Sequence, residues 1–298
     1  MVMTGGTSGF GAIAAERLAR DGARLLIGAR REAPAGEAIP LDLTELASVR
    51  SFAESVRARL GTTPVDALVL NAGMILPDVT GRTADGFETA FAVNHLAHYL
   101  LVRLLLPTLA DRAIIVLTTS GTHDPANRAG LETPRHADAE LLAHPDRDPG
   151  LDPRPAKAGE HAYTASKLCA ILTVRSLSAH PDVLSRRITV IAYDPGQVFG
   201  TGLSKNLSLP LRVAWVVLGT PLGRPMRWFN PFLNGRAAAG GTLADLSLGR
   251  VTPPDGRTFT ALRRERLTWP DPSEQGRSDA LAQALWDDSA RLTGLPPT

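Results

Sequence analysis

The chain has 298 residues, of which 44% are hydrophobic and 21% are charged, as expected for a globular protein with a substantial core. Its formal net charge of +2 comes from interspersed acidic and basic residues, which gives no clustered basic surface for nucleic acid. The lone Cys169 excludes an intramolecular disulfide, and the sequence shows neither a signal peptide nor a run of about 20 apolar residues. We therefore expect a single cytoplasmic domain over residues 1–298, and we identify no metal site.

Short apolar runs alternate with longer amphipathic segments through the first two thirds of the chain. The expected strands are Val2 to Thr4, Arg24 to Gly28, Ala67 to Leu70, Ala113 to Thr118 and Thr189 to Tyr193. The expected helices are Phe10 to Arg20, Leu46 to Leu60, Ala84 to Leu109, Ala162 to Ala179 and Asp279 to Thr293. This alternation is typical of βαβ units and predicts an α/β fold with a parallel sheet.

Two regions interrupt this alternation. Residues 121–160 hold six prolines among polar and charged side chains, which indicates an irregular surface insertion. Residues 203–240 are apolar and aromatic, with Trp215, Trp228 and Phe232 set among arginines. We interpret them as a helical substrate-binding lid that forms one wall of an apolar pocket. A segment resting on a membrane surface is the alternative.

A glycine-rich stretch, TGGTSGFG, directly follows the first expected strand and opens the first expected helix. Glycines in this position let the backbone approach a pyrophosphate, and the helix N-terminus supplies free N–H groups. The strand before it and the helix after it make the pattern more specific than a glycine loop alone. The residues expected to contact a dinucleotide here are Gly5, Thr7, Ser8, Gly9, Phe10 and Gly11.

The end of the second strand decides which nicotinamide cofactor fits. An NAD enzyme needs an acidic residue there for the ribose 2′-hydroxyl, whereas an NADP enzyme needs an arginine for the 2′-phosphate. The sequence IGARRE offers Arg30 and Arg31, and it places Glu32 behind them. We therefore favour NADPH/NADP+ over NAD, with an unrelated pair of surface arginines as the remaining interpretation.

Tyr163 precedes Lys167 by four residues in AYTASKLCAI, a segment with helical periodicity. Residues at this spacing project from the same side of a helix, so the ammonium could favour the phenolate and lower the pKa of the phenol from about 10. Only three of the 32 basic residues are lysine. A surface helix with an unrelated Tyr and Lys fits the same pattern, since the spacing alone is a weak signal.

Several motifs occur together in the order found in one large family. They are TGGTSGFG, Asp42 in PLDL, LNAG at Leu70 to Gly73, Asn94 in VNHLAHYLL, TTSGTH around Ser120, YTASK, and DPGQVFGTGL from Asp194. In these motifs the chain resembles the short-chain dehydrogenase/reductase superfamily nearly end to end. It is most similar to the branch of retinol dehydrogenases and light-dependent protochlorophyllide reductases. The resemblance implies a Rossmann-type, doubly wound parallel sheet in a single domain, with the insertion before the catalytic helix.

The resemblance also implies a role for each matching residue. Tyr163 would be the general acid and base, Lys167 would hold the nicotinamide ribose and lower the pKa of Tyr163, Ser120 would bind the substrate oxygen, and Asn94 would anchor a water that relays protons. Asp42 would meet the adenine, and the loop that starts at Pro195 would touch the nicotinamide amide. The remaining cofactor contacts implied by the match are Leu43, Asn71, Ala72, Gly73, Gly196, Val198 and Thr201.

These expectations together describe an NADP(H)-dependent oxidoreductase of specialised metabolism acting on a hydrophobic ketone, aldehyde or alcohol. An alkene reductase with the same fold and a catalytically silent dinucleotide sensor are the alternatives. Protochlorophyllide reductases carry a cysteine where this chain has Gln197, which favours an ordinary carbonyl substrate. Because 43 residues separate Ser120 from Tyr163, where much of the family needs about a dozen, we expect the insertion to weaken a family dimer interface. A monomer or a weak homodimer is the resulting expectation.

Overall fold

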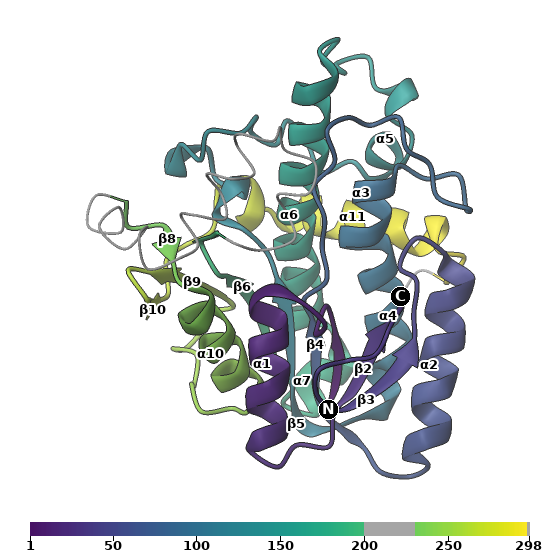
Figure 1. Cartoon of the computed structure of the whole chain (residues 1–298). Helices are drawn as coiled ribbons and strands as arrows, with labels where there is room; N and C mark the ends of the chain where they lie inside the picture. Colours follow the sequence, from purple (N-terminus) through teal and green to yellow (C-terminus); the bar gives the residue numbers. More distant parts are fainter. Residues whose placement is uncertain (200–229, 297–298) are drawn as a thin grey trace.

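The computed structural model describes residues 1–199 and 230–296, which form one α/β layer structure around a twisted sheet (Figure 1). The strands are β1 (Val2–Thr4), β2 (Leu26–Ala29), β3 (Glu37–Pro40), β4 (Val65–Leu70), β5 (Leu109–Thr118), β6 (Thr189–Asp194), β7 (Gln197–Val198), β8 (Leu233–Asn234), β9 (Phe259–Arg263) and β10 (Arg266–Thr268). The helices are α1 (Gly9–Arg20), α2 (Leu46–Leu60), α3 (Thr89–Phe91), α4 (Ala97–Leu105), α5 (Ala139–Ala143), α6 (Pro155–Ala179), α7 (Pro181–Ser185), α10 (Arg236–Ser247) and α11 (Asp279–Leu292).

The main sheet has the strand order β10-β9-β6-β5-β4-β1-β2-β3. Every neighbouring pair is parallel except β9 and β10, which form an antiparallel hairpin at one edge. The chain first adds β2 and β3 on one side of β1 and then continues with β4 on the other side. The strand order therefore reverses between β1 and β4. Crevices at the carboxyl ends of the strands beside such a reversal are where ligands bind in open α/β sheets. The expected Rossmann-type doubly wound sheet is confirmed.

Alternate residues along the central strands enter two separate cores. Val2, Leu68 and Ile115 pack into the core under α2, α4, α6 and α11, whereas their neighbours Met3 and Val69 face α1 and α10 on the opposite side. This period of two on strands whose central positions are apolar is what a parallel sheet covered on both faces requires. The site residues at the strand ends are therefore held by a sheet that is packed on both sides.

All five expected strands and all five expected helices are present, β1 and α2 with the expected bounds and the others with shifted ones, whereas β3, β7, β8, β9 and β10 were not expected. β3 is short and exposed in part, and its sequence EAIP includes a proline. β9 and β10 lie in an arginine-rich segment without a clear period of two. Their pairing with β2 and β6, rather than their own composition, makes them strands.

The insertion over 121–160 is more ordered than the expected irregular surface segment. It contains 3₁₀ turns at Gly121–His123, Pro125–Asn127 and Pro145–Arg147, as well as α5. Apolar side chains of α5 join the core beneath α3. Helix α6 also begins within it, at Pro155 instead of Ala162. Three of its six prolines, Pro125, Pro145 and Pro155, lie at the start of a 3₁₀ turn or a helix, where their fixed φ is compatible with helical backbone.

A long apolar run that begins with α3 leads into β5. It comprises α3, a π-helical turn at Ala92–Leu96, α4 and a 3₁₀ turn at Leu106–Thr108. The resulting 20-residue run, Thr89–Thr108, has the length and hydropathy of a membrane span, in contrast to the expectation that no such stretch exists. Because 83% of its most apolar window is buried within the fold, we interpret it as a core helix.

Most of the expected lid, residues 203–229, lies outside the described residues. Of its described part, residues 230–232 lie in the wall of a cavity, and residues 236–240 form the start of α10. A Cβ atom on Gly240 would lie 2.5 Å from Phe10 O, so α10 packs directly on α1 at this point. The expected lid over 203–240 stays a prediction.

Candidate active site

The glycine loop between β1 and α1 has a backbone path that requires glycine. Gly5 and Gly9 have positive φ angles of 68° and 60°. A Cβ atom on Gly5 would lie 2.6 Å from Ala72 N, and one on Gly11 would overlap Gly5 O. Ser8 occupies the N-cap of α1 without a side-chain capping bond, which leaves N–H groups of the first turn for an anion. The loop thus fits a dinucleotide pyrophosphate.

Asn71 connects the carboxyl ends of β1, β4 and β5. Its Nδ2 donates to Gly5 O at 3.0 Å, and Thr118 Oγ1 donates to its Oδ1 at 2.9 Å. The backbone N–H groups of Asn71 and Ala72 both donate to Thr4 Oγ1. The segment after β4, which is expected to contact the cofactor, is therefore held against the glycine loop.

The ends of β2 and β3 bring together the residues expected to select the cofactor. Arg30, Arg31 and Glu32 are all exposed just after β2. Asp42 follows β3, and its Oδ1 accepts hydrogen bonds from the backbone and the hydroxyl of Thr44. Partial burial opposes ionisation of Asp42, but these hydrogen bonds and the charge of Arg30 hold its pKa below the ordinary value. The two arginines and the carboxylates of Glu32 and Asp42 thus lie at the same edge of the sheet.

Asn94 lies in the π-helical turn and fixes the segment after β4. Its Oδ1 accepts from Met74 N at 2.8 Å, while its Nδ2 donates to Met74 O at 2.8 Å and to Ser166 Oγ at 3.0 Å. A Cβ atom on Gly73 would lie 3.2 Å from Lys167 Nζ and 3.3 Å from Asn94 Oδ1. A π-helical turn often marks a functional position, and here it directs Asn94 toward the region of Lys167.

Ser120, Tyr163 and Lys167 converge at the carboxyl ends of β5 and β6. Ser120 follows β5 and forms a side-chain hydrogen bond with Tyr163 from α6. Lys167 Nζ donates to Thr118 O at 3.3 Å and lies 5.7 Å from the centroid of the Tyr163 ring. Tyr163 is 9% exposed and Lys167 is 5% exposed, so both groups are largely shielded from water.

The two pKa shifts differ from the sequence-based expectation. Burial raises the pKa of Tyr163 to about 12, an effect that the hydrogen bond from Ser120 opposes and the charge of Asp194 reinforces. Burial also lowers the pKa of Lys167 to about 8. The pKa of Tyr163 therefore shifts opposite to the expected direction, because desolvation of the phenol is the largest influence on it and Lys167 is not among the groups that shift it. At neutral pH the phenol carries a proton that it can donate.

The loop after β6 is fixed by its backbone. Gly196 has a φ of 70°, and a Cβ atom on it would contact Phe232 O and the side chain of Asn234. Pro195 O accepts a hydrogen bond from Asn234 Nδ2 at 3.0 Å, and Val198 is buried in β7. Thr201 lies outside the described residues. Of the other expected contacts, Thr7 and Ser8 are exposed, and Phe10 and Leu43 are partly buried against the two cores.

Sequence reasoning missed two groups that contact this site. His123 Nδ1–H donates to Ser120 O at 2.7 Å, while its Nε2 accepts from Ser273 N at 3.3 Å. Asp194, which is fully buried, forms an ion pair with Arg263 at 2.8 Å. His123 could have been identified from the sequence, because it belongs to the TTSGTH motif that identified Ser120. The sequence offered no signal for Arg263, because its strand was not expected.

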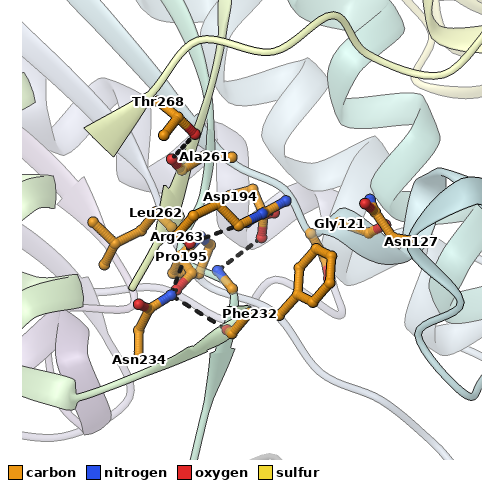
Figure 2. Close-up of polar contacts among 12 residues, drawn as sticks. Gly121, Asn127, Asp194, Pro195, Phe232, Asn234, Ala261, Leu262, Arg263 and Thr268 are labelled. Carbon is orange, nitrogen blue, oxygen red and sulfur yellow. Dashed lines mark hydrogen bonds and ion pairs between the residues drawn. The ribbon is translucent and has the colours of Figure 1, made fainter. Parts of the chain in front are cut away.

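A cavity of about 300 Å³ opens beside Ser120. Its walls include the polar side chains of Asn127 and Gln197 and the ring of Phe232. Figure 2 shows Gly121, Asn127, Asp194 and Phe232 gathered in this region. A small organic molecule could therefore reach the Ser120 hydroxyl from a partly apolar space.

The sequence matches a family model described as short chain dehydrogenase over residues 1–128. It is 32% identical to the bovine dehydrogenase/reductase SDR family member 13, with 99% of this chain and 73% of that protein covered. It is also 32% identical to a putative daunorubicin C-13 ketoreductase from Streptomyces sp. (strain C5), covering 99% of this chain and 92% of the relative. Protochlorophyllide reductase A of Oryza sativa subsp. japonica is 31% identical over 99% of this chain and 80% of its own length.

Solved structures show the same architecture. An uncharacterised protein from Mycobacterium paratuberculosis superposes with a TM-score of 0.68 at 26% identity, covering 100% of this chain and 94% of the other. A protein from a metagenomic library, solved with NADPH, gives a TM-score of 0.57 at 24% identity, with coverage of 88% and 94%. At this identity the second likeness concerns the fold alone.

Proposed function

Because the chain belongs to the short-chain dehydrogenase/reductase superfamily, in the branch of retinol dehydrogenases and protochlorophyllide reductases, we propose that it is an NADP(H)-dependent oxidoreductase for a hydrophobic ketone, aldehyde or alcohol. The observation that carries the proposal is the hydrogen bond between Ser120 and Tyr163 beside a cavity. The phenol of Tyr163, as proton donor, and the hydroxyl of Ser120 are thereby placed next to each other, as reduction of a carbonyl requires.

The proton chemistry follows from the groups at this site. A nicotinamide supplies the hydride for a carbonyl carbon or accepts it from an alcohol. Tyr163 gives its phenolic proton to the carbonyl oxygen as that oxygen becomes an alcohol, and Ser120 orients the oxygen. The phenolate then regains a proton from the side of Lys167, whose pKa of about 8 lets it exchange protons near neutrality. Oxidation of an alcohol runs through the same groups in reverse.

The cofactor proposal has two parts. The glycine loop and the adjoining backbone after β4 would hold the pyrophosphate and the adenosine ribose, since the close approach of these two backbone segments requires glycine at positions 5 and 11. Arg30 and Arg31, exposed at the end of β2, favour a 2′-phosphate and hence NADP(H). Glu32 leaves NAD as the alternative.

The relatives suggest which substrates to test. The names of two curated relatives refer to retinol and to a ketone of daunorubicin. Purified protein should therefore oxidise NADPH in the presence of an aromatic polyketide ketone, a retinoid aldehyde or a steroid-like ketone. Product analysis decides between carbonyl reduction, which yields an alcohol, and alkene reduction, which leaves the carbonyl intact. Tight NADPH binding without turnover of any compound would support the dinucleotide-sensing alternative.

We also propose that the protein works in the cytoplasm as a monomer or a weak homodimer. Nearly every residue of α6 from Ala158 to Val174 is buried within the chain, under α3, α11 and the insertion. This helix therefore offers little surface to a second copy. Light scattering that gave a stable tetramer at micromolar concentration would contradict this proposal.

A further inference from the structure

Asp194 places a carboxyl group inside the candidate site. It ends β6 and has no exposed surface. Its Oδ1 accepts the backbone N–H of Gly196 at 2.8 Å, which fixes the loop after β6. A Cβ atom on Gly121 would lie 2.9 Å from its Oδ2, so the loop that carries Ser120 passes directly over the carboxylate. Both loops around the cavity therefore contact Asp194.

Arg263 supplies the opposite charge from β9. Its Nη1 lies 2.8 Å from Asp194 Oδ2, and Figure 2 shows the guanidinium between Asp194 and Phe232. Nη1 also donates to Leu262 O at 3.0 Å, and none of the residues that the structure describes donates a hydrogen bond of good geometry to Oδ2. The contact is thus mainly electrostatic. A buried carboxylate in such a position depends on its counter-charge, since leaving one partner alone is costly.

One further contact holds the guanidinium, and a second set of bonds fixes the strand that carries it. It stacks over the Phe232 ring with a separation of 4.6 Å from the centroid. Asn234, whose Nδ2 donates to both Pro195 O and Leu262 O, ties the loop after β6 to the same strand. The side chain of Arg263 is 17% exposed. Its position is therefore fixed by the fold and not by a flexible surface contact.

The charge of Asp194 acts on ionisable groups from every element packed around it. Arg263 faces it from β9, Tyr163 and Lys167 face it from α6, and His123 faces it from the segment after β5. Tyr193, its neighbour in β6, is also affected. For each of these titrating groups on α6 and after β5, the carboxylate favours the protonated form. A change in its net charge would therefore alter proton transfer at Tyr163.

We propose that Arg263 is a positioning residue of the active site, whose guanidinium neutralises the buried Asp194 carboxylate and so sets the charge experienced by Tyr163 and Lys167. The catalytic consequence rests on the proposed function, but the electrostatic coupling does not. The pair joins the hairpin at the edge of the sheet to the two loops around the cavity. It thereby connects the carboxyl-terminal part of the chain to the acid that protonates the substrate.

The test follows the ionisation of residue 163 directly, without a substrate. A fluorinated tyrosine, which is more acidic than tyrosine, replaces Tyr163 and is titrated by fluorine NMR in the full-length protein. Removing the negative charge in Asp194→Asn should move the titration to lower pH by about one unit or more. Removing the positive charge in Arg263→Met should move it to higher pH. Arg263→Lys should titrate close to the wild type because it keeps the charge.

The double variant Asp194→Asn/Arg263→Met gives the decisive comparison. It should recover both the wild-type titration and most of the stability to urea that Arg263→Met loses, because no unpaired charge remains buried. If Arg263→Met does not fold, a folded double variant supports the proposal and an unfolded one overturns it. Arg17→Met is a matched control, since Arg17 pairs with Asp245 at 2.6 Å away from this site. It should leave the titration unchanged.

Turnover separates this inference from the proposed function. With an accepted substrate, the pH profile of kcat should move with the titration of residue 163, while the KM for the cofactor stays within about twofold. If the titration shifts as described and no carbonyl compound is reduced, the proposed function fails and the role of Arg263 stands. If all variants titrate alike, the role of Arg263 is wrong even when the enzyme is active.

Discussion

Ser120 and Tyr163 share a hydrogen bond although 43 positions separate them in the sequence. Ser120 lies just after β5, and Tyr163 lies in α6, which packs against β5 and β6. The intervening insertion returns the chain through α5 to the start of α6 (Figure 1). The long detour therefore ends with the two hydroxyl groups in contact beside the cavity.

Replacing Tyr163 by phenylalanine should lower kcat by about 10² to 10⁴-fold, because the ring is kept while the transferable proton is lost. NADPH binding, measured by fluorescence, should change little. Tyr99→Phe provides the control, since the Tyr99 hydroxyl accepts a hydrogen bond from Arg103 in a different part of the core. Normal turnover by Tyr163→Phe would show that another group donates the proton.

Lys167 should make the stability of the protein increase with pH. Its pKa is lowered to about 8 in the folded state from 10.5, so between these values the unfolded chain binds a proton that the folded chain has released. The shift corresponds to a gain of about 3 kcal/mol in the free energy of unfolding across this window. Urea unfolding of the wild type and of Lys167→Met at several pH values measures the gain as the difference between the two.

Lys157→Met is the control for that measurement. Lys157 lies on the surface beside Glu132 and Glu160, whose hydrogen bonds raise its pKa. Its removal should leave the increase between pH 8 and 10.5 intact. An equal pH dependence in the wild type and in Lys167→Met would show that the ammonium of Lys167 is not desolvated.

The parts of this site that the sequence predicted are those with local signals. The glycine loop and the Tyr163–Lys167 spacing each lie within a few residues, and their elements have clear periodicity. The Asp194–Arg263 pair depends on β9 joining β6, a contact between residues far apart in the chain. The raised pKa of Tyr163 depends on how many neighbours exclude water, which spacing on one helix does not reveal. Long-range packing is thus what sequence reasoning lacked.

Gly11→Ala should abolish dinucleotide binding, since its new Cβ atom would overlap Gly5 O and displace the loop. The same change should lower stability, because the obstructing atoms belong to the backbone and cannot rotate away. Gly22→Ala is a suitable control, since Gly22 has a φ of 88° but no atom within 4 Å of a Cβ. It should cost about 1 kcal/mol of stability and leave binding intact. Calorimetric titration with NADPH distinguishes the two variants.

Arg30→Ala/Arg31→Ala should convert a preference for NADPH into indifference between NADPH and NADH. Both side chains are exposed just after β2, where their positive charges suit a 2′-phosphate. The KM for NADPH should rise by about 10- to 100-fold, while the KM for NADH should change by less than about threefold. Arg20→Ala, which removes an exposed arginine from the last turn of α1, controls for net charge. A parallel rise of both KM values would instead indicate that the arginines bind a phosphate common to the two cofactors.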